Sequence, residues 1–213
     1  MKRVINLDNW NRKEHFKFFS ALDDPFWGIT TTVDFTSVYQ QSKNMEVSFF
    51  LYSVYFLLKC INATTAFKLR IENGEVVEYD KINISPTIGR EDGTFGFGFF
   101  EYDTDLSLFI ENAEKEIHRV KNSAGLSFSK DTARADVIRY SALPWFAFSE
   151  MKHAGSIQTG DSIPKISTGK LIQEKKKLLL PISISVHHGL VDGRNVAEFI
   201  QNLKDGQNNT CLL

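Results

Sequence analysis

The sequence lacks an excess of charge of either sign and lacks a long apolar run. Its 25 basic and 26 acidic residues leave a formal net charge of −1. This balance provides no electrostatic attraction for nucleic acid or for an anionic membrane surface. The longest apolar run, around residues 49–58, is too short to cross a bilayer. The basic residues near the N-terminus do not precede the apolar segment of a signal peptide. We therefore expect no nucleic-acid partner and no membrane association.

Cysteine is also scarce, since Cys60 and Cys211 are the two in the sequence. Two cysteines form neither the disulfide framework of a small secreted protein nor a zinc site. Cys211 is third from the end, so the C-terminal prenylation pattern is absent as well. We expect a cytoplasmic location and no metal site.

The chain does have the length and apolar content of a folded domain. It has 213 residues, of which 42% are hydrophobic and 24% charged. No internal repeat or interdomain linker interrupts it, so we expect a single domain over residues 1–213. The 18 phenylalanines exceed what a core of this size needs. They indicate either an aromatic pocket or subunit contact, or a core that favours phenylalanine.

Local patterns predict both helices and strands. Asn73-Gly74 separates two short strand-like runs and predicts a tight type I′ hairpin. Capping residues predict helices after Asp8 and after Asp105, and residues 45–58 predict a buried helix. Residues 27–35, 94–99, 137–148 and 166–172 are expected to be extended, and residues 149–167 to form a long functional loop.

The segment that carries most chemical information runs from Leu178 to Leu203. Alternation along residues 178–188 places His187 and His188 on opposite faces of a strand, with His188 continuing the apolar face. An apolar environment disfavours the imidazolium form, and a neutral imidazole is what a general base requires. Asp192-Gly193 then ends the strand and begins a helix, where Asp192 occupies the N-cap position.

This His-His-x-x-x-Asp-Gly pattern resembles that of the chloramphenicol acetyltransferase superfamily. Residues 9–16 (NWNRKEHF), 141–145 (SALPW) and 178–181 (LLLP) resemble three further segments of that family, in the same order. The resemblance implies an α+β fold, a two-layer α/β sandwich in which helices pack on a mixed sheet. It also implies a homotrimer with active sites between subunits.

The same resemblance implies a set of catalytic residues. His188 would be the general base for acetyl transfer from acetyl-CoA to a hydroxyl of chloramphenicol or a related small acceptor. Ser141 would donate a hydrogen bond to the oxyanion of the tetrahedral intermediate. Arg12 would pair with Asp192 and brace the loop that holds His188, so Asp192 has a structural role and no Ser-His-Asp triad is expected. Acetyl-CoA would be a co-substrate, with no permanently bound cofactor.

Further residues are assigned to substrate binding by the same resemblance. Phe19 stands where the family has a chloramphenicol-contacting tyrosine, and Trp27 adds bulk beside it. Ser167 replaces a threonine that orders solvent. Phe95 lies on the aromatic face of residues 94–99, whose glycines indicate either one wall of a binding tunnel or tight packing on a helix.

The CoA site is assigned to Trp145, Lys170 and Leu171. In the family, an aromatic residue that packs near the CoA adenine occupies the position of Leu171. The catalytic residues are thus retained while the pocket differs. Two acceptors are therefore considered, namely chloramphenicol and a different hydroxyl compound.

Three alternative functions share parts of this pattern. A dihydrolipoyl acyltransferase core has a His-x-x-x-Asp-Gly motif but accompanies a lipoyl domain and linker. The spacing from His187 to Asp192 also fits glycerolipid acyltransferases, against which the SALPW segment argues. A non-catalytic trimeric binding protein on the same fold would require the loss of one catalytic group.

Overall fold

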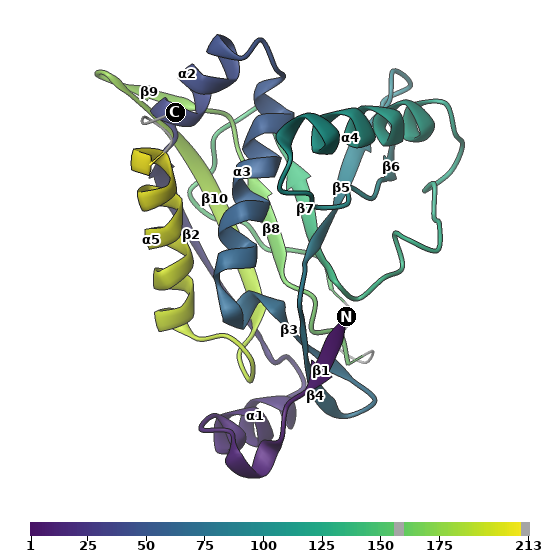
Figure 1. The fold of residues 1–213 in the computed structure, drawn as a ribbon, viewed down its shortest axis with the longest axis vertical. Helices are drawn as coiled ribbons and strands as arrows, with labels where there is room; N and C mark the ends of the chain where they lie inside the picture. The colour runs from purple at the N-terminus through teal and green to yellow at the C-terminus, as the bar shows by residue number, and fades with distance from the viewer. Residues whose placement is uncertain (156–159, 210–213) are drawn as a thin grey trace.

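A mixed β-sheet forms the centre of the structure, and helices cover one of its faces (Figure 1). The computed structural model describes residues 1–155 and 160–209, so Cys211 lies outside the described residues. The strands of the main sheet are β2 (Phe26–Asp34), β5 (Asn83–Gly89), β6 (Phe95–Phe97), β7 (Val137–Ala142), β8 (Lys165–Thr168), β9 (Ile172–Glu174) and β10 (Lys177–His187). Their order is β2-β10-β8-β7-β5-β6, and β9 pairs with β10. β7 is parallel to both β5 and β8, whereas β10 is antiparallel to its neighbours. The predicted α+β fold with a mixed sheet is therefore confirmed.

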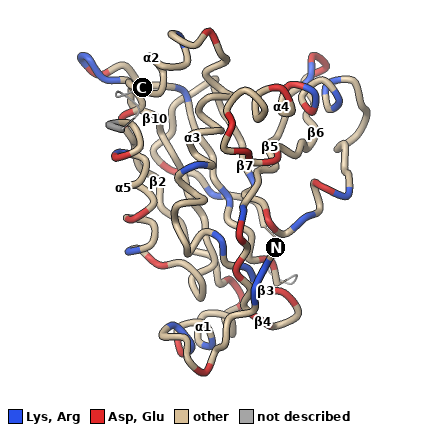
Figure 2. Tube along the Cα trace, viewed as in Figure 1, with Lys and Arg blue, Asp and Glu red and all other residues tan. Residues whose placement is uncertain are grey.

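The helices are α1 (Lys13–Ser20), α2 (Thr36–Asn44), α3 (Phe49–Ala63), α4 (Leu106–Lys121) and α5 (Gly193–Asn209), with short 3-10 turns at η1 (Leu7–Asn9) and η2 (Thr65–Lys68). α3, α4 and α5 lie over the sheet, while α1 lies at one end of the molecule (Figure 1). Asp105 caps α4 by accepting hydrogen bonds from the backbone N–H groups of Ser107 and Leu108, as its sequence position predicted. Basic and acidic residues are interspersed along α4 and α5 (Figure 2), as expected for solvated helix faces.

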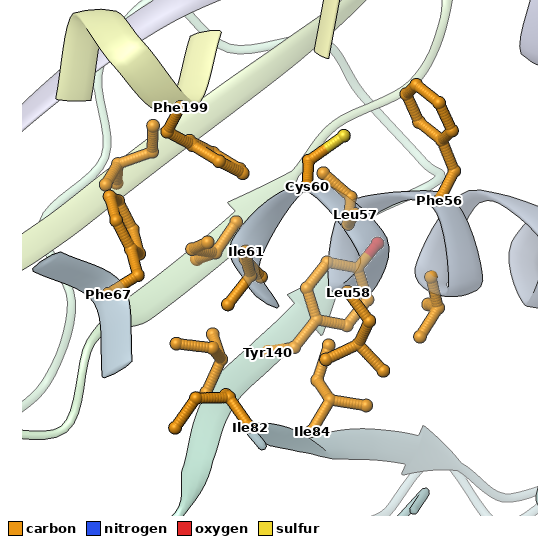
Figure 3. Packing of buried hydrophobic residues seen from close by; sticks show 14 of the residues in the cluster. Phe56, Leu57, Leu58, Cys60, Ile61, Phe67, Ile82, Ile84, Tyr140 and Phe199 are labelled. Atoms are coloured by element: carbon orange, nitrogen blue, oxygen red, sulfur yellow. The ribbon is translucent and has the colours of Figure 1, made fainter. Parts of the chain in front are cut away.

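The alternation of β10 decides which face of the sheet is the core. Leu180, Ile182, Ile184 and Val186 are buried against the helices, with at most 3% of their surface exposed. On the helix side, residues of α3 pack with Phe67 and Phe199, whose rings lie 4.8 Å apart (Figure 3). Ser183, Ser185 and His187 therefore point to the opposite, helix-free face.

A second sheet lies beside the main one and has the order β1-β4-β3. Its strands are β1 (Lys2–Val4), β3 (Leu69–Glu72) and β4 (Glu75–Tyr79). Asn73 and Gly74 connect β3 to β4 with φ values of 52° and 81°. Two consecutive positive φ angles are those of a type I′ turn, so the predicted hairpin is confirmed.

Several predicted boundaries were wrong. The buried helix begins at Phe49, because Glu46 has a φ of 56° and separates it from α2. Strand β6 is limited to three residues, and β7 ends at Ala142, before Pro144. The segment expected to be extended over residues 166–172 is divided into β8 and β9. Of the two alternatives given for the glycines of residues 94–99, tight packing applies to Gly96. A Cβ there would lie 2.5 Å from the Arg90 guanidinium and the Ser127 hydroxyl.

Arg70 joins β3 to the segment before β7 from a fully buried position. Its side chain has no exposed surface and donates hydrogen bonds to the carbonyls of Phe67, Leu69, Ala135 and Val137. Burial lowers the pKa of this guanidinium to about 10. The guanidinium thus satisfies backbone acceptors that belong to two separate parts of the chain.

Replacing Arg70 with leucine is expected to destabilise the protein by at least about 3 kcal/mol. The substitution leaves several buried carbonyls without this donor, and each unsatisfied polar group costs about 1–3 kcal/mol. Urea unfolding monitored by circular dichroism measures the change. Arg194→Leu, on the exposed first turn of α5, is the matched control and should change stability little. Equal midpoints for the two variants would contradict the role given to Arg70.

Candidate active site

The loop after β10 carries His188 and is attached to the protein at several points. The His188 backbone N–H donates to the Pro25 carbonyl over 2.8 Å, and the Val191 N–H donates back to the His187 carbonyl over 3.0 Å. The indole Nε1 of Trp27 donates to the Val191 carbonyl over 3.0 Å. The loop packs closely at Gly189, because a Cβ there would lie 3.0 Å from the His187 ring and 3.3 Å from the Phe16 Cα.

Arg12 connects this loop to the N-terminal region of the chain. One guanidinium nitrogen donates to the Asp192 carboxylate, and the other donates to the His188 carbonyl over 3.2 Å. Arg12 is the N-cap residue of α1. Asp192 also accepts hydrogen bonds from the backbone N–H groups of Arg194 and Asn195 at the start of α5. Burial raises the pKa of Asp192, but the bonds from Arg12 and the backbone outweigh it, so the pKa lies below its usual value.

The imidazole of His188 lies between aromatic side chains. Phe19 stacks on it with ring centroids 3.8 Å apart and planes at 12°, and the Trp27 ring lies 5.4 Å away. The ring nitrogen Nδ1 is buried. Arg12, Phe19, Trp27, His188 and Asp192 thus form one cluster, which we call the histidine half-site.

The expectation that His188 continues the apolar face of the strand was wrong in one respect. β10 ends at His187, and His188 begins the loop with a partly exposed side chain. His187 is the more buried of the two, with 3% of its surface exposed. Burial lowers the pKa of His187 to about 4. Its Nδ1 accepts a hydrogen bond from the Gly189 N–H over 3.2 Å, so His187 supports the loop.

Ser141 lies on the helix-free face of the sheet, in a row of hydroxyl groups. Its neighbour in register on β8 is Ser167, which in turn lies level with Ser183 on β10. The hydroxyl of Ser167 is 3.0 Å from Nε2 of His153. The sequence did not single out His153, although it lies in the loop that was predicted to be functional.

The residues assigned to the CoA site lie near the same end of the sheet. Trp145 lies four residues after Ser141 in the chain, beyond the end of β7, and 73% of its surface is exposed. The Lys170 backbone N–H donates to the Phe146 carbonyl over 2.9 Å, which holds the two segments together. Leu171 packs against the hydrophobic core, and Phe95, on β6, is 47% exposed. We call Ser141, Ser167, Phe95, Trp145, Lys170 and Leu171 the serine half-site.

Within one chain the two half-sites are well separated. Ser141 and Ser183 lie two strands apart at the same level, and His188 lies five residues beyond Ser183, just past the end of β10. With a rise of about 3.3 Å per residue and a strand spacing of about 4.8 Å, Ser141 and His188 are roughly 15–20 Å apart. The His188 ring and the Ser141 hydroxyl of one chain are therefore too far apart to contact the same small group.

A cavity of about 710 Å³ lies on the helix-free face, lined mainly by residues of β2, the start of β8, the end of β10 and the loop before β8. His153, Lys165, Ser185 and His187 are among its lining residues. The Lys165 ammonium is 3.2 Å from the Asp161 carboxylate and 4.0 Å from the centre of the Phe26 ring. His188 does not line this cavity, but Trp27 lines it and also contacts the His188 ring.

Comparison with known proteins shows the family to which the chain belongs. The family model described as chloramphenicol acetyltransferase matches residues 2–204. The chain belongs to the chloramphenicol acetyltransferase family. Chloramphenicol acetyltransferase 3 of Escherichia coli is 27% identical over 202 residues, which cover 94% of each chain. A solved chloramphenicol acetyltransferase structure superposes with a TM-score of 0.88 at 30% identity, covering 96% of this chain and 99% of the other.

The fold is shared more widely than this family. A dihydrolipoamide acetyltransferase of Azotobacter vinelandii has a TM-score of 0.69 at 14% identity, covering 91% of this chain and 85% of the other. Such a likeness concerns the fold alone.

The site of this family member contains no thiol or metal cluster within the described residues. Cys60 is buried, and burial raises the pKa of its thiol to about 12, so it is not an activated nucleophile. The described part of the chain has no group of three His, Cys, Asp or Glu side chains placed to hold a metal ion. No helix within residues 1–155 and 160–209 is long and apolar enough to cross a membrane.

The buried His187 makes stability depend on pH. Because its folded pKa of about 4 lies below the usual value of 6.5, the unfolded chain binds the proton more tightly. Its contribution to stability is complete above pH 6.5 and is lost as the pH falls towards 4. His187→Asn removes the titrating group and keeps an acceptor for the Gly189 N–H.

We expect urea midpoints of the wild type to fall more steeply between pH 6.5 and 4 than those of His187→Asn. The matched control is His118→Asn, at an exposed position on α4, which should follow the wild type. Parallel curves for all three proteins would show that His187 does not cause the pH dependence.

Proposed function

We propose that this protein is a single-domain O-acetyltransferase that moves the acetyl group of acetyl-CoA to a hydroxyl of chloramphenicol or a related small acceptor. The observation that carries the proposal is the match to the chloramphenicol acetyltransferase family over residues 2–204. The contacts of Arg12 with Asp192 and with the His188 carbonyl support it, because they fix the loop that presents the imidazole. A cytoplasmic location, proposed with this activity, agrees with the scarcity of cysteine.

His188 is the proposed general base. Its Nδ1 is buried, so we assign Nε2 as the nitrogen that takes the proton of the acceptor hydroxyl. The hydroxyl oxygen then attacks the thioester carbonyl to give a tetrahedral intermediate. Collapse of that intermediate breaks the carbon–sulfur bond, and the imidazolium returns its proton to the departing thiolate. The products are the acetyl ester and CoA, and no acyl-enzyme forms.

Ser141 is the proposed oxyanion donor. Its hydroxyl lies on the helix-free face of the sheet beside Ser167 and near the exposed Trp145. A hydrogen bond aimed at the oxygen of the intermediate contributes about 3–4 kcal/mol of transition-state stabilisation. Asp192 and Arg12 do not touch the reacting atoms in this scheme, and they position His188.

We propose that the active sites form between chains of a homotrimer. The support is the distance of roughly 15–20 Å between Ser141 and His188 of one chain, which follows from the strand register. Both groups must lie within hydrogen-bond reach of one intermediate. A neighbouring chain that brings its histidine half-site to the serine half-site of the first meets this requirement. Cyclic symmetry then repeats the same contact three times.

The remaining residues have proposed binding roles. Phe19 and Trp27 lie against the His188 ring, which supports contacts with an acceptor whose hydroxyl reaches that ring. Ser167 and Phe95 would contact the acceptor from the serine half-site. Trp145, Lys170 and Leu171 would contact CoA, a role that the exposed indole of Trp145 and the bond between residues 170 and 146 support.

A dihydrolipoamide thiol is the second candidate acceptor, because the A. vinelandii acetyltransferase shares the fold. Parallel assays of acetyl transfer to chloramphenicol and to dihydrolipoamide separate the two. A protein that releases CoA with neither acceptor, nor with other small alcohols, would instead fit a non-catalytic binding role.

Replacing His188 with alanine should lower kcat by at least about 10²–10⁴, because the general base is lost. The measurement is release of CoA thiol from acetyl-CoA in the presence of chloramphenicol. His15→Ala, on the exposed side of α1, is the control and should retain the wild-type rate. Similar rates for His188→Ala and the wild type would eliminate His188 as the base.

Mixed assembly of two inactive variants tests the shared site. If each site takes its histidine from one chain and its serine from another, equal co-expression of His188→Ala and Ser141→Ala restores about a quarter of the wild-type activity. This fraction is the probability that both contributing chains carry the intact residue. The two variants purified separately and combined just before the assay form the control. If co-expression restores no activity, both residues act within one chain.

A further inference from the structure

Ser141 is flanked by hydroxyl groups on both neighbouring strands. On β8 its partner in register is Ser167, and on β5 the hydroxyl of Thr87 lies 3.2 Å from the Ser141 oxygen. Serine has a single hydroxyl proton but two acceptor positions, so its neighbours decide where that proton points. A serine that donates to an oxyanion must not donate to the sheet.

Thr87 is the donor in the contact with Ser141. Its Oγ1–H group points to Oγ of Ser141 and occupies one of the two acceptor positions there. The Ser141 proton is then directed away from Thr87. Because a threonine side chain has few χ1 rotamers, this donor is held firmly in place.

The rigid surroundings of β5 fix Thr87 at this level. Pro86 pairs with Tyr140 across the parallel strands, and Ile84 and Ile88, on the same strand, are buried in the core. Alternation along β5 therefore places Thr87 on the helix-free face, beside Ser141.

The other neighbour of Ser141 is already engaged. The Ser167 hydroxyl lies 3.0 Å from Nε2 of His153, and Ser167 is only 1% exposed. This contact draws the Ser167 hydroxyl towards His153. Among the described residues no hydrogen bond joins the Ser141 and Ser167 hydroxyls, so the proton of Ser141 is left for a group that enters from outside the sheet.

We propose that Thr87 is a positioning residue for oxyanion stabilisation, acting by a hydrogen bond that orients the hydroxyl of Ser141 towards the substrate. The inference rests on the proposed acetyltransferase function and on the role of Ser141 in it. Thr87 acts through Ser141 alone, so its effect belongs to the chemical step and not to the binding of either substrate.

Steady-state kinetics with acetyl-CoA and chloramphenicol test the proposal. Thr87→Val removes the hydroxyl and keeps the shape, and we expect kcat to fall about fivefold to tenfold, the usual value of one hydrogen bond. KM for both substrates should stay within a factor of two. Thr87→Ser retains the donor and should recover most of the rate.

The double variant with Ser141→Ala gives the decisive readout. Without the Ser141 hydroxyl there is nothing to orient, so Thr87→Val should cause no further loss in that background. A loss caused by misfolding would reappear there, so the comparison holds even if Thr87→Val lowers stability. Thr32→Val, at an exposed position on β2, is the matched control and should leave kcat unchanged.

Three results would overturn the inference. The first is an equal loss from Thr87→Val in the wild-type and Ser141→Ala backgrounds. The second is a rise in kcat, which would mean that Ser141 donates to Thr87 in the wild type. The third is an unchanged kcat for Thr87→Val when Ser141→Ala is impaired. Each of these three results refutes the role of Thr87 and leaves the proposed acetyltransferase function standing. A wild type that releases no CoA would instead contradict the proposed function.

Discussion

The contact of Arg12 with Asp192 and the His188 carbonyl is the interaction on which the site depends. These partners lie about 180 residues apart in the chain, and the guanidinium joins them at the point where β10 ends. Asp192 also accepts from the first backbone N–H groups of α5, so one carboxylate fixes both the helix start and the loop. A histidine just beyond a strand end would otherwise have considerable freedom. Here its backbone is held on both sides, and its ring is held by Phe19.

The central sheet determines where the candidate site residues lie. Its apolar face is covered by helices, and its other face carries the hydroxyls of Ser141, Ser167 and Ser183 in register. Because the sheet is rigid, it also keeps the serine and histidine half-sites apart within one chain. The separation is a consequence of register, and it is the physical reason for proposing that chains combine to form each site.

Local sequence patterns were reliable where short-range physics decides the structure. Backbone angles, capping bonds and alternation predicted the Asn73-Gly74 turn, the Asp105 and Asp192 caps and the inward face of β10. The structure has all of them. Boundaries were less reliable. Residues 45–58 read as one helix because they are apolar, but the positive φ of Glu46 interrupts it. The assignment of the buried histidine was also wrong, since the strand ends one residue earlier than alternation suggested and His187 is the one enclosed.

The sequence by itself determined the family, the fold class and the residue types that the chemistry requires, because motifs and periodicity are properties of neighbouring residues. Only the tertiary structure decided which of those residues meet. Nothing in the order of residues indicates that Thr87 lies 3.2 Å from Ser141, that His153 engages Ser167, or that Arg70 serves four carbonyls. Such contacts depend on strand register and on packing between distant segments. A shift of one residue in register would turn each of these side chains to the other face.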